Sequence, residues 1–172
     1  MTSVDVIEAR ADQRSAIANM MQLYIHDFSE QWAGQARGEL NESGLFEDYP
    51  LDPYWSKPDH IPLLIRAGGA LAGFVLVDAH AHSGLTLDRS VAEFFVVRKH
   101  RRGGVGAAAA RAVFMRWPGQ WEAAVARRNL GALAFWRRVV AETPGVTAVE
   151  ELDVSTDGWN GPILRFCFGC HP

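Results

Sequence analysis

The chain has 172 residues, of which 48% are hydrophobic and 22% charged, and its formal net charge is -3. This length is typical of one domain with a real core, so we expect residues 1–172 to form a single domain, and the mildly acidic balance disfavours nucleic acid as a partner. No run approaches the ~20 apolar residues of a membrane span, and the start of the chain lacks the basic and apolar parts of a secretory signal, which predicts a cytoplasmic protein with no membrane contact.

The first half of the chain predicts a strand, a helix, a long connection and a hairpin. Residues 4–8 alternate apolar and acidic side chains, as a half-buried strand does. The helix that follows has an apolar stripe, which we expect to face the core, at Ile17, Met20, Met21, Tyr24 and Phe28. Residues 31–60 form a connection rich in glycine, proline and aromatic residues, and such long connections are usually functional. Apolar runs at 61–65 and 71–77 flank two glycines, which predicts a hairpin.

The second half predicts strands and helices in alternation. Residues 91–97 read as a strand, residues 105 to about 116 as a helix ended by Pro118 and Gly119, and residues 121–126 as another strand. A helix over residues 129–140 follows. Two last strands are expected over residues 146–154 and 162–168. This order of elements predicts a mixed α/β (α+β) fold.

The turn between the strand at 91–97 and the next helix predicts a phosphate site. Its sequence is Arg101-Arg102-Gly103-Gly104-Val105-Gly106. Glycines remove side chains that would keep an anion away from the main chain, and the helix adds its positive end. The arginines, with Lys99 and His100, supply positive charge. Taken alone, this pattern also fits a dinucleotide or nucleoside triphosphate site.

Two spaced motifs extend this interpretation. In chain order they are Arg101-x-x-Gly104-x-Gly106 and Asn129-x-x-Ala132-x-x-Phe135-Trp136. Together with the order of elements, they resemble the GNAT superfamily of acetyl-coenzyme A-dependent N-acyltransferases over nearly the whole chain. Residues 93–97 and the strand at Trp121-Glu122 are similar to a bacterial subgroup of predicted acetyltransferases. The resemblance implies a twisted, mostly antiparallel sheet of about six or seven strands with about four flanking helices, splayed between the fourth and fifth strands.

The resemblance also implies a site for acetyl-coenzyme A as cosubstrate, without a metal. The main chain around the glycine-rich turn would bind the pyrophosphate, and this part of the site comprises Arg101, Arg102, Gly103, Gly104, Val105, Gly106 and Ala107. Main-chain groups of Val96 and Val97 would pair with the pantetheine and polarise the thioester carbonyl. Asn129, one turn ahead of Ala132, would bond to the pantetheine amides or to a neighbouring backbone group, and Phe135 and Trp136 would flank the arm. An alternative role for Asn129 is that of a helix cap.

The implied reaction is direct attack by the neutral primary amine of a small molecule or peptide, which requires a base. Glu93 is the first candidate, since strand alternation places it on one face with Phe95 and Val97; it could equally be an exposed residue paired with arginine. His26, beside Asp27, is a second candidate, and its alternative is a polar helix end. The family often has tyrosine where this chain has Trp136, and an indole is no acid. The leaving thiolate would then take its proton from Tyr24, Tyr49, Tyr54 or water, or it would leave without a proton donor.

Two short motifs invite other interpretations. His80-x-His82 could bind a metal, but no third and fourth ligands stand at suitable spacing, which favours a polar loop. Cys167-x-x-Cys170-His171 matches covalent haem attachment, yet it lies at the end of a predicted strand with no export signal. We expect two reduced thiols there instead.

Three functions compete on this sequence. The two ordered motifs favour an N-acetyltransferase, and Trp136 leaves open a non-catalytic acyl-coenzyme A-binding module or sensor. The basic run 98–102 raises nucleic-acid binding as a third. Aromatic residues in the connection 31–60 predict a partly apolar acceptor. The oligomeric state stays open, with a homodimer as the commonest assembly of soluble proteins.

Overall fold

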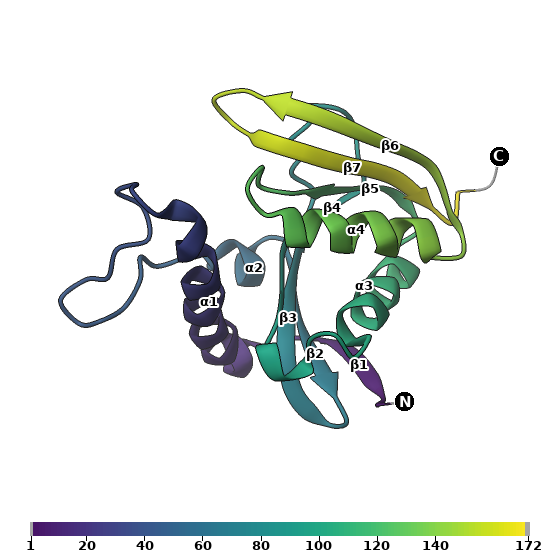
Figure 1. The fold of residues 1–172 in the computed structure, drawn as a ribbon. Helices are drawn as coiled ribbons and strands as arrows, with labels where there is room; N and C mark the ends of the chain where they lie inside the picture. Colours follow the sequence, from purple (N-terminus) through teal and green to yellow (C-terminus); the bar gives the residue numbers. More distant parts are fainter. Residues whose placement is uncertain (1, 171–172) are drawn as a thin grey trace.

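A twisted seven-stranded sheet forms the centre of the structure, which is a computed structural model and describes residues 2–170 (Figure 1). The strands lie in the order β1-β2-β3-β4-β5-β7-β6. Their bounds are β1 Val4–Glu8, β2 Ile61–Ala67, β3 Ala70–Asp78, β4 Arg89–Val96, β5 Gly119–Ala124, β6 Val146–Ser155 and β7 Asn160–Phe168. All neighbours are antiparallel except the parallel pair β4 and β5. The predicted mixed, mostly antiparallel fold is confirmed.

Helices cover both faces of this sheet. In Figure 1, α1 (Arg14–Ser29) lies on one side of β3 and α3 (Val105–Arg116) on the other, and α4 (Leu130–Glu142) lies on the same side as α3. Helix α2 (Pro53–Ser56) is a single turn, and short 3-10 turns occupy Ala11–Gln13, Glu30–Trp32 and Arg98–His100. No helix within residues 2–170 combines the length and apolarity that a membrane crossing needs.

The core consists of two apolar layers, one on each face of the sheet. On the α3 and α4 side, Phe114, Trp121 and Phe166 are fully buried. On the α1 side, Ile17, Met21 and Phe74 are buried together. The predicted stripe of α1 is therefore confirmed in its first turns. At its end Tyr24 and Phe28 are only half-buried, because they line cavities rather than the core.

The sheet opens between β4 and β5. The two strands pair at only three positions, from Arg89 with Trp121 to Val91 with Ala123. Immediately afterwards the β3–β4 register skips Ala92, since Leu76 pairs with Glu93 and Val77 with Val91. Such a bulge bends a strand and increases its twist. Among residues 2–170, strand β4 beyond Val91 pairs only with β3, which confirms the expected splay.

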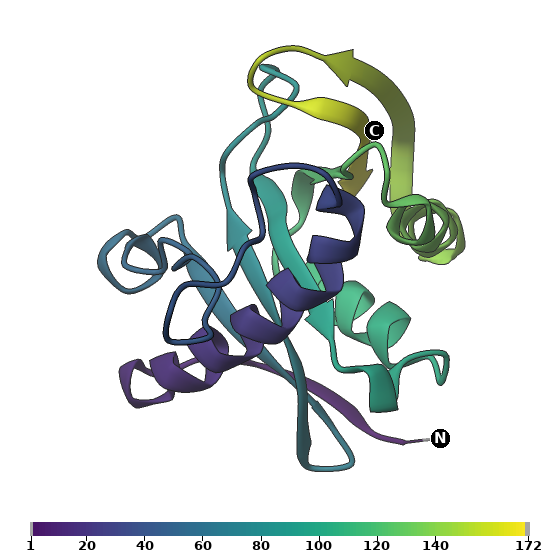
Figure 2. The same cartoon turned by 60° about the vertical axis from the view of Figure 1, so that its left-hand side comes forward.

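Gly119 and the two cysteines differ from the sequence prediction. Gly119, expected only to end a helix, opens β5, because its backbone pairs with Phe168 at the end of β7. Cys167 and Cys170 are joined as a disulfide rather than carrying reduced thiols, with Cα atoms 5.9 Å apart. The chain bends between them at Gly169, whose φ is 66°. His171, the last residue of the haem-like motif, lies outside the described residues. Figure 2 shows this hairpin of β6 and β7 at the far end of the molecule from the N-terminus.

Candidate active site

The turn before α3 presents a row of free backbone donors. Arg102 and Gly104 have left-handed backbones, with φ of 64° and 83°. Gly104 accepts the first helical hydrogen bond from Ala108 at 3.0 Å. Among the described residues, no acceptor pairs with the N–H groups of residues 102–107. Consecutive free amides at a helix N-terminus form an anion site, so the predicted cradle has the required geometry.

The same turn leaves room for a large anion. A Cβ added at Gly103 or at Gly104 would meet no atom within 4 Å. A cavity of about 650 Å³, here called the donor cavity, adjoins the turn on the side of the open sheet. Its walls include Arg102, Gly104, Ala107, Asn129, Phe135 and Arg138. The turn and the cavity therefore fit the pyrophosphate and pantetheine of coenzyme A.

Arg101 lines this cavity but points its charge at the protein. Its Nε donates to the Val96 carbonyl at 2.6 Å, and its guanidinium also pairs with Asp27 of α1. Arg98 pairs with the same carboxylate at 2.7 Å. Burial opposes ionisation of Asp27, yet the hydrogen bonds from the two arginines hold its pKa below the ordinary value. Arg101 thus ties the end of β4 to α1, and Arg102 is the arginine of the turn with a free charge.

Every second residue of β4 directs its backbone N–H and C=O groups toward the gap between β4 and β5. The Val97 N–H donates to the Ala72 carbonyl of β3 at 2.9 Å, and the Val97 carbonyl accepts from the His100 N–H at 2.9 Å, so both backbone groups of Val97 already have partners. Because backbone groups of neighbouring strand residues face opposite sides, those of Val96 and Phe94 face the gap. Arg101 occupies the Val96 carbonyl. The N–H of Val96 and both backbone groups of Phe94 remain available.

Helix α4 closes the other side of the gap. The Asn129 side chain accepts from the Ala132 N–H at 3.1 Å, so it acts as a helix cap, and both residues also line the gap. Phe135 packs so near Gly106 that a Cβ there would lie 3.2 Å from its ring. Trp136 is 6% exposed and faces the core and the second cavity described below, rather than the donor cavity.

A second cavity of about 590 Å³, here called the acceptor cavity, lies across the same gap. It is enclosed by α1, the ends of β3 and β4, the connection 32–50, and Trp159 before β7. Tyr24, Phe28, Phe94, Asn129 and Ala132 line both cavities. The two cavities therefore meet beside Phe94, where β4 leaves β5.

Glu93 is the central ionisable group of the acceptor cavity. It keeps some exposed surface because it lines the cavity, while protein surrounds it on most sides. Burial raises its pKa to about 7, against opposing effects of the Tyr24 and Tyr49 hydroxyls and of Arg37, and with a further rise from the charge of Asp78. A carboxyl with this pKa can accept a proton near neutral pH.

The tyrosines beside Glu93 stay protonated. Burial raises the pKa values of Tyr24, Tyr49 and Tyr54 above the ordinary value of a phenol, and the charge of Glu93 adds to each rise. Tyr24 stands at the junction of the cavities. His26 does not join it: its side chain is exposed on α1 and lines neither cavity. Sequence reasoning found Glu93 and Tyr24 but could not separate them from His26, which lies on the same helix outside the inward face.

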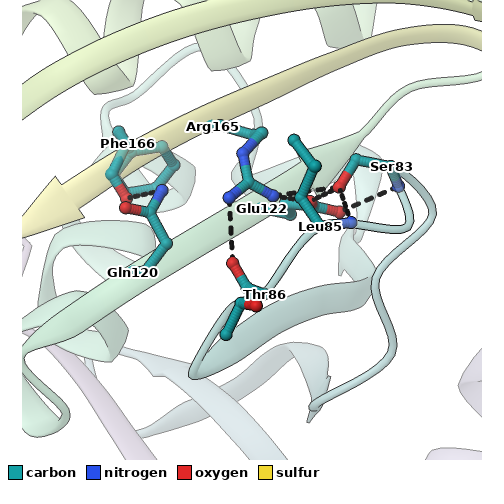
Figure 3. Close-up of polar contacts among 7 residues, drawn as sticks. All are labelled: Ser83, Leu85, Thr86, Gln120, Glu122, Arg165 and Phe166. Carbon is teal, nitrogen blue, oxygen red and sulfur yellow. Dashed lines mark hydrogen bonds and ion pairs between the residues drawn. The ribbon is translucent and has the colours of Figure 1, made fainter.

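The sequence interpretation missed a buried ion pair that supports the acceptor cavity. Glu122 of β5 is fully buried and pairs with Arg165 of β7 (Figure 3). Ser83 bonds to both partners, and Arg165 also donates to the Thr86 carbonyl at 2.9 Å. These bonds hold the β3–β4 loop, which carries His80 and His82 into the cavity wall. A charged residue inside each of two apolar strands was the signal that could have revealed the pair.

The two histidines of that loop pack edge to face. Their ring centroids lie 4.6 Å apart at 88°, and His82 also lies 4.3 Å from the Trp159 ring. Burial, with the charge of His80, lowers the pKa of His82. Within residues 2–170 no group of three or more potential ligands gathers around a common point. The polar-loop interpretation agrees with this arrangement.

Comparison with known proteins gives a family and a fold. The family model described as "Acetyltransferase (GNAT) family" matches residues 17–140. No curated protein matches the sequence. A GNAT-family acetyltransferase structure from Staphylococcus aureus Mu50 is 11% identical with a TM-score of 0.58, covering 96% of this chain and 99% of that one. An acetyltransferase from Thermus thermophilus is 13% identical with the same score, covering 96% of each chain.

One similar structure contains the cosubstrate. It is yncA, a putative acetyltransferase from Salmonella typhimurium with acetyl-coenzyme A, which is 14% identical with a TM-score of 0.54. The match covers 95% of this chain and 91% of that one. At such identities these likenesses establish the shared fold.

Proposed function

Because the chain belongs to the GNAT family, and is thus an acyltransferase that uses acetyl-coenzyme A, we propose that it acetylates the primary amine of a small molecule or peptide. The observation that carries this proposal is the meeting of two cavities at the splay, with Glu93 facing only the acceptor side. The single sheet includes strands from both ends of the chain, which supports residues 1–172 as one domain.

The donor side would hold acetyl-coenzyme A mainly through the main chain. The free amides of residues 102–107 fit the pyrophosphate, and Arg102 and Arg138 line the cavity with compensating charge. The free backbone groups of Phe94 and Val96 suit the amides of a pantetheine arm. When bound, acetyl-coenzyme A supplies an activated thioester.

The acceptor side would bind the amine and remove a proton. An alkylammonium has a pKa of about 10, so most of the substrate arrives charged and must lose a proton before it attacks. Glu93, whose pKa is about 7, accepts that proton. The N–H of Phe94 or of Val96, which faces the gap, stabilises the negative charge that develops on the acyl oxygen, an effect of about 3 kcal/mol.

Tyr24 is the proposed donor of a proton to the leaving sulfur. It is the phenol that lines both cavities, and it is protonated at neutral pH. Trp136 stands where the family often has tyrosine, but its indole N–H does not ionise at working pH. Tyr24 of α1 supplies the hydroxyl from the opposite wall.

Release of free thiol from acetyl-coenzyme A tests this function. The purified protein is incubated with acetyl-coenzyme A and a panel of alkylamines, arylalkylamines and peptides, and each acetylated product is identified by mass. We expect amine-dependent thiol release with at least one class. Thermal stabilisation by acetyl-coenzyme A, with no turnover over the whole panel, would reject the amine acceptor.

A further inference from the structure

The acceptor cavity contains a second carboxylate with no cation beside it. Asp78, at the end of β3, is 8% exposed and lines the cavity wall. Its carboxylate accepts from the His80 N–H at 2.9 Å and from the Tyr54 hydroxyl at 3.4 Å. Within residues 2–170 it forms no ion pair, in contrast to Glu122, the other buried carboxylate, which Arg165 neutralises. Burying an unpaired charge is costly, so this position favours a cationic ligand.

Asp78 and Glu93 lie on the same face of neighbouring strands. Leu76 pairs with Glu93 across β3 and β4, and Asp78 follows Leu76 by two residues, which returns it to the same face. Asp78 itself pairs with Ser90, two residues along β3 from the pair of Leu76 and Glu93 and across the bulge at Ala92. The two carboxylates are thus separate positions in one cavity, close enough for a short chain to reach both.

The wall between and around these positions suits methylene groups and ammonium ions. Tyr49, Phe94, His82 and Trp159 line it, and the last two rings are in contact, with a tilt of 36° between them. Ring faces attract cations and pack against alkyl chains. Burial lowers the pKa of His82, which disfavours a competing positive charge on its ring. Glu47 and Asp48 at the rim add negative charge, and Arg37 and His80 are basic side chains of the same lining.

We propose that the acceptor is a diamine: one amine is acetylated at Glu93 while the second, as an ammonium ion, pairs with Asp78. This rests on the proposed function and narrows its substrate class. The second amine takes no part in bond formation. Its charge is neutralised at Asp78, and that contact orients the chain so that the other nitrogen faces the gap.

The test compares amines that differ only in the distal group. Initial rates of thiol release are measured with diaminobutane and butylamine, and with diaminopentane and pentylamine, on the wild-type protein. We expect kcat/KM to be about tenfold or more higher for each diamine, which corresponds to about 1.4 kcal/mol. The difference should be mainly in KM and should shrink at high salt. This comparison needs no variant to fold.

Asp78→Asn then assigns the preference to this side chain. We expect the ratio of diamine to monoamine kcat/KM to approach one in this variant. Asp12→Asn, at an exposed aspartate remote from the cavity, should keep the wild-type ratio. Circular dichroism and thermal unfolding confirm that both variants are folded.

The outcomes are separable from failure of the proposed function. Turnover of monoamines at least as fast as diamines, or of peptides in preference to both, overturns the diamine inference and leaves acetyl transfer intact. An unchanged diamine preference in folded Asp78→Asn also overturns it. Absence of turnover with every amine rejects the proposed function itself.

Discussion

The donor and acceptor sides of the gap differ in the chemical groups that line them. On the donor side, one continuous segment from β4 through the glycine-rich turn into α3 offers backbone N–H groups. On the acceptor side, side chains from α1, the connection 32–50, β3, β4 and the segment before β7 converge. A backbone site tolerates many side chains and suits an invariant cosubstrate, whereas a side-chain site can be altered one residue at a time. We therefore expect substitutions to affect one side without the other.

The largest effect is expected from Arg165→Met, below the acceptor side. It leaves the fully buried Glu122 without its cation and removes bonds to Ser83 and Thr86. We expect the free energy of unfolding, measured with urea, to fall by about 3–5 kcal/mol. Arg137→Met, which breaks an exposed ion pair with Glu151, is the control and should cost about 1 kcal/mol or less. Equal losses of unfolding free energy in the two variants would show that the buried ion pair contributes no more to stability than the exposed one.

The double variant Glu122→Leu/Arg165→Met sharpens this comparison. Apolar replacement of a buried ion pair is often neutral for stability, so the unfolding loss should largely disappear. The loop with His80 and His82 would still lack its anchors to Arg165 and Glu122. We expect a raised KM for the amine and an unchanged Kd for acetyl-coenzyme A, measured by calorimetry. A changed Kd for acetyl-coenzyme A would show that the acceptor side influences the donor side.

Glu93→Gln should stop chemistry while sparing the donor side. General-base catalysis typically contributes about 10²–10⁴-fold, so we expect kcat to fall about 100-fold or more with an unchanged Kd for acetyl-coenzyme A. Glu150→Gln, on the exposed face of β6, is the matched control. Steady-state thiol release measures both. Near wild-type kcat in Glu93→Gln would remove Glu93 from the base role.

Gly104→Val tests the donor side alone. Valine is strained at a φ of 83° by roughly 1–2 kcal/mol, and its side chain would enter the space next to the free amides. We expect affinity for acetyl-coenzyme A to fall about tenfold, with kcat less affected. Gly44→Val imposes similar strain at a φ of 74°, also in open space, outside both cavities. If Gly104→Val binds acetyl-coenzyme A with the wild-type Kd, the proposed binding of the pyrophosphate by the main chain is refuted.

The smallest effect concerns pH on the acceptor side. Glu93 acts as a base only when ionised, so kcat/KM should rise with pH around a midpoint near its pKa of about 7. The negative charge of Asp78 contributes to that raised pKa. Asp78→Asn removes it, and the midpoint should move to lower pH by a fraction of a unit. A profile with butylamine isolates this change, and an upward shift would contradict the assignment.

The sequence alone determined the features that depend on local backbone and periodicity. Alternation at residues 4–8 and apolar or extended runs elsewhere predicted the strands, and the apolar stripe of α1 predicted Ile17 and Met21 in the core. Three glycines between a strand and a helix predicted the cradle, because φ near 80° at Gly104 and a free helix N-terminus follow from neighbouring residues. Asn129 before α4 was correctly expected at a helix start.

Only the tertiary structure decided which side chains from distant segments meet, and which backbone groups are already paired within the sheet. In the folded chain Arg101 bonds to Val96 and Asp27, and the Val97 N–H pairs within the sheet. Tyr24 lines the same cavity as Glu93, whereas His26 lies outside it. It also brought Asp78, His82 and Trp159 to one wall. These outcomes depend on strand register, the bulge at Ala92 and packing between segments far apart in the chain. Such relations leave no periodic signal in the sequence, since each residue's neighbours exist only after the sheet has formed.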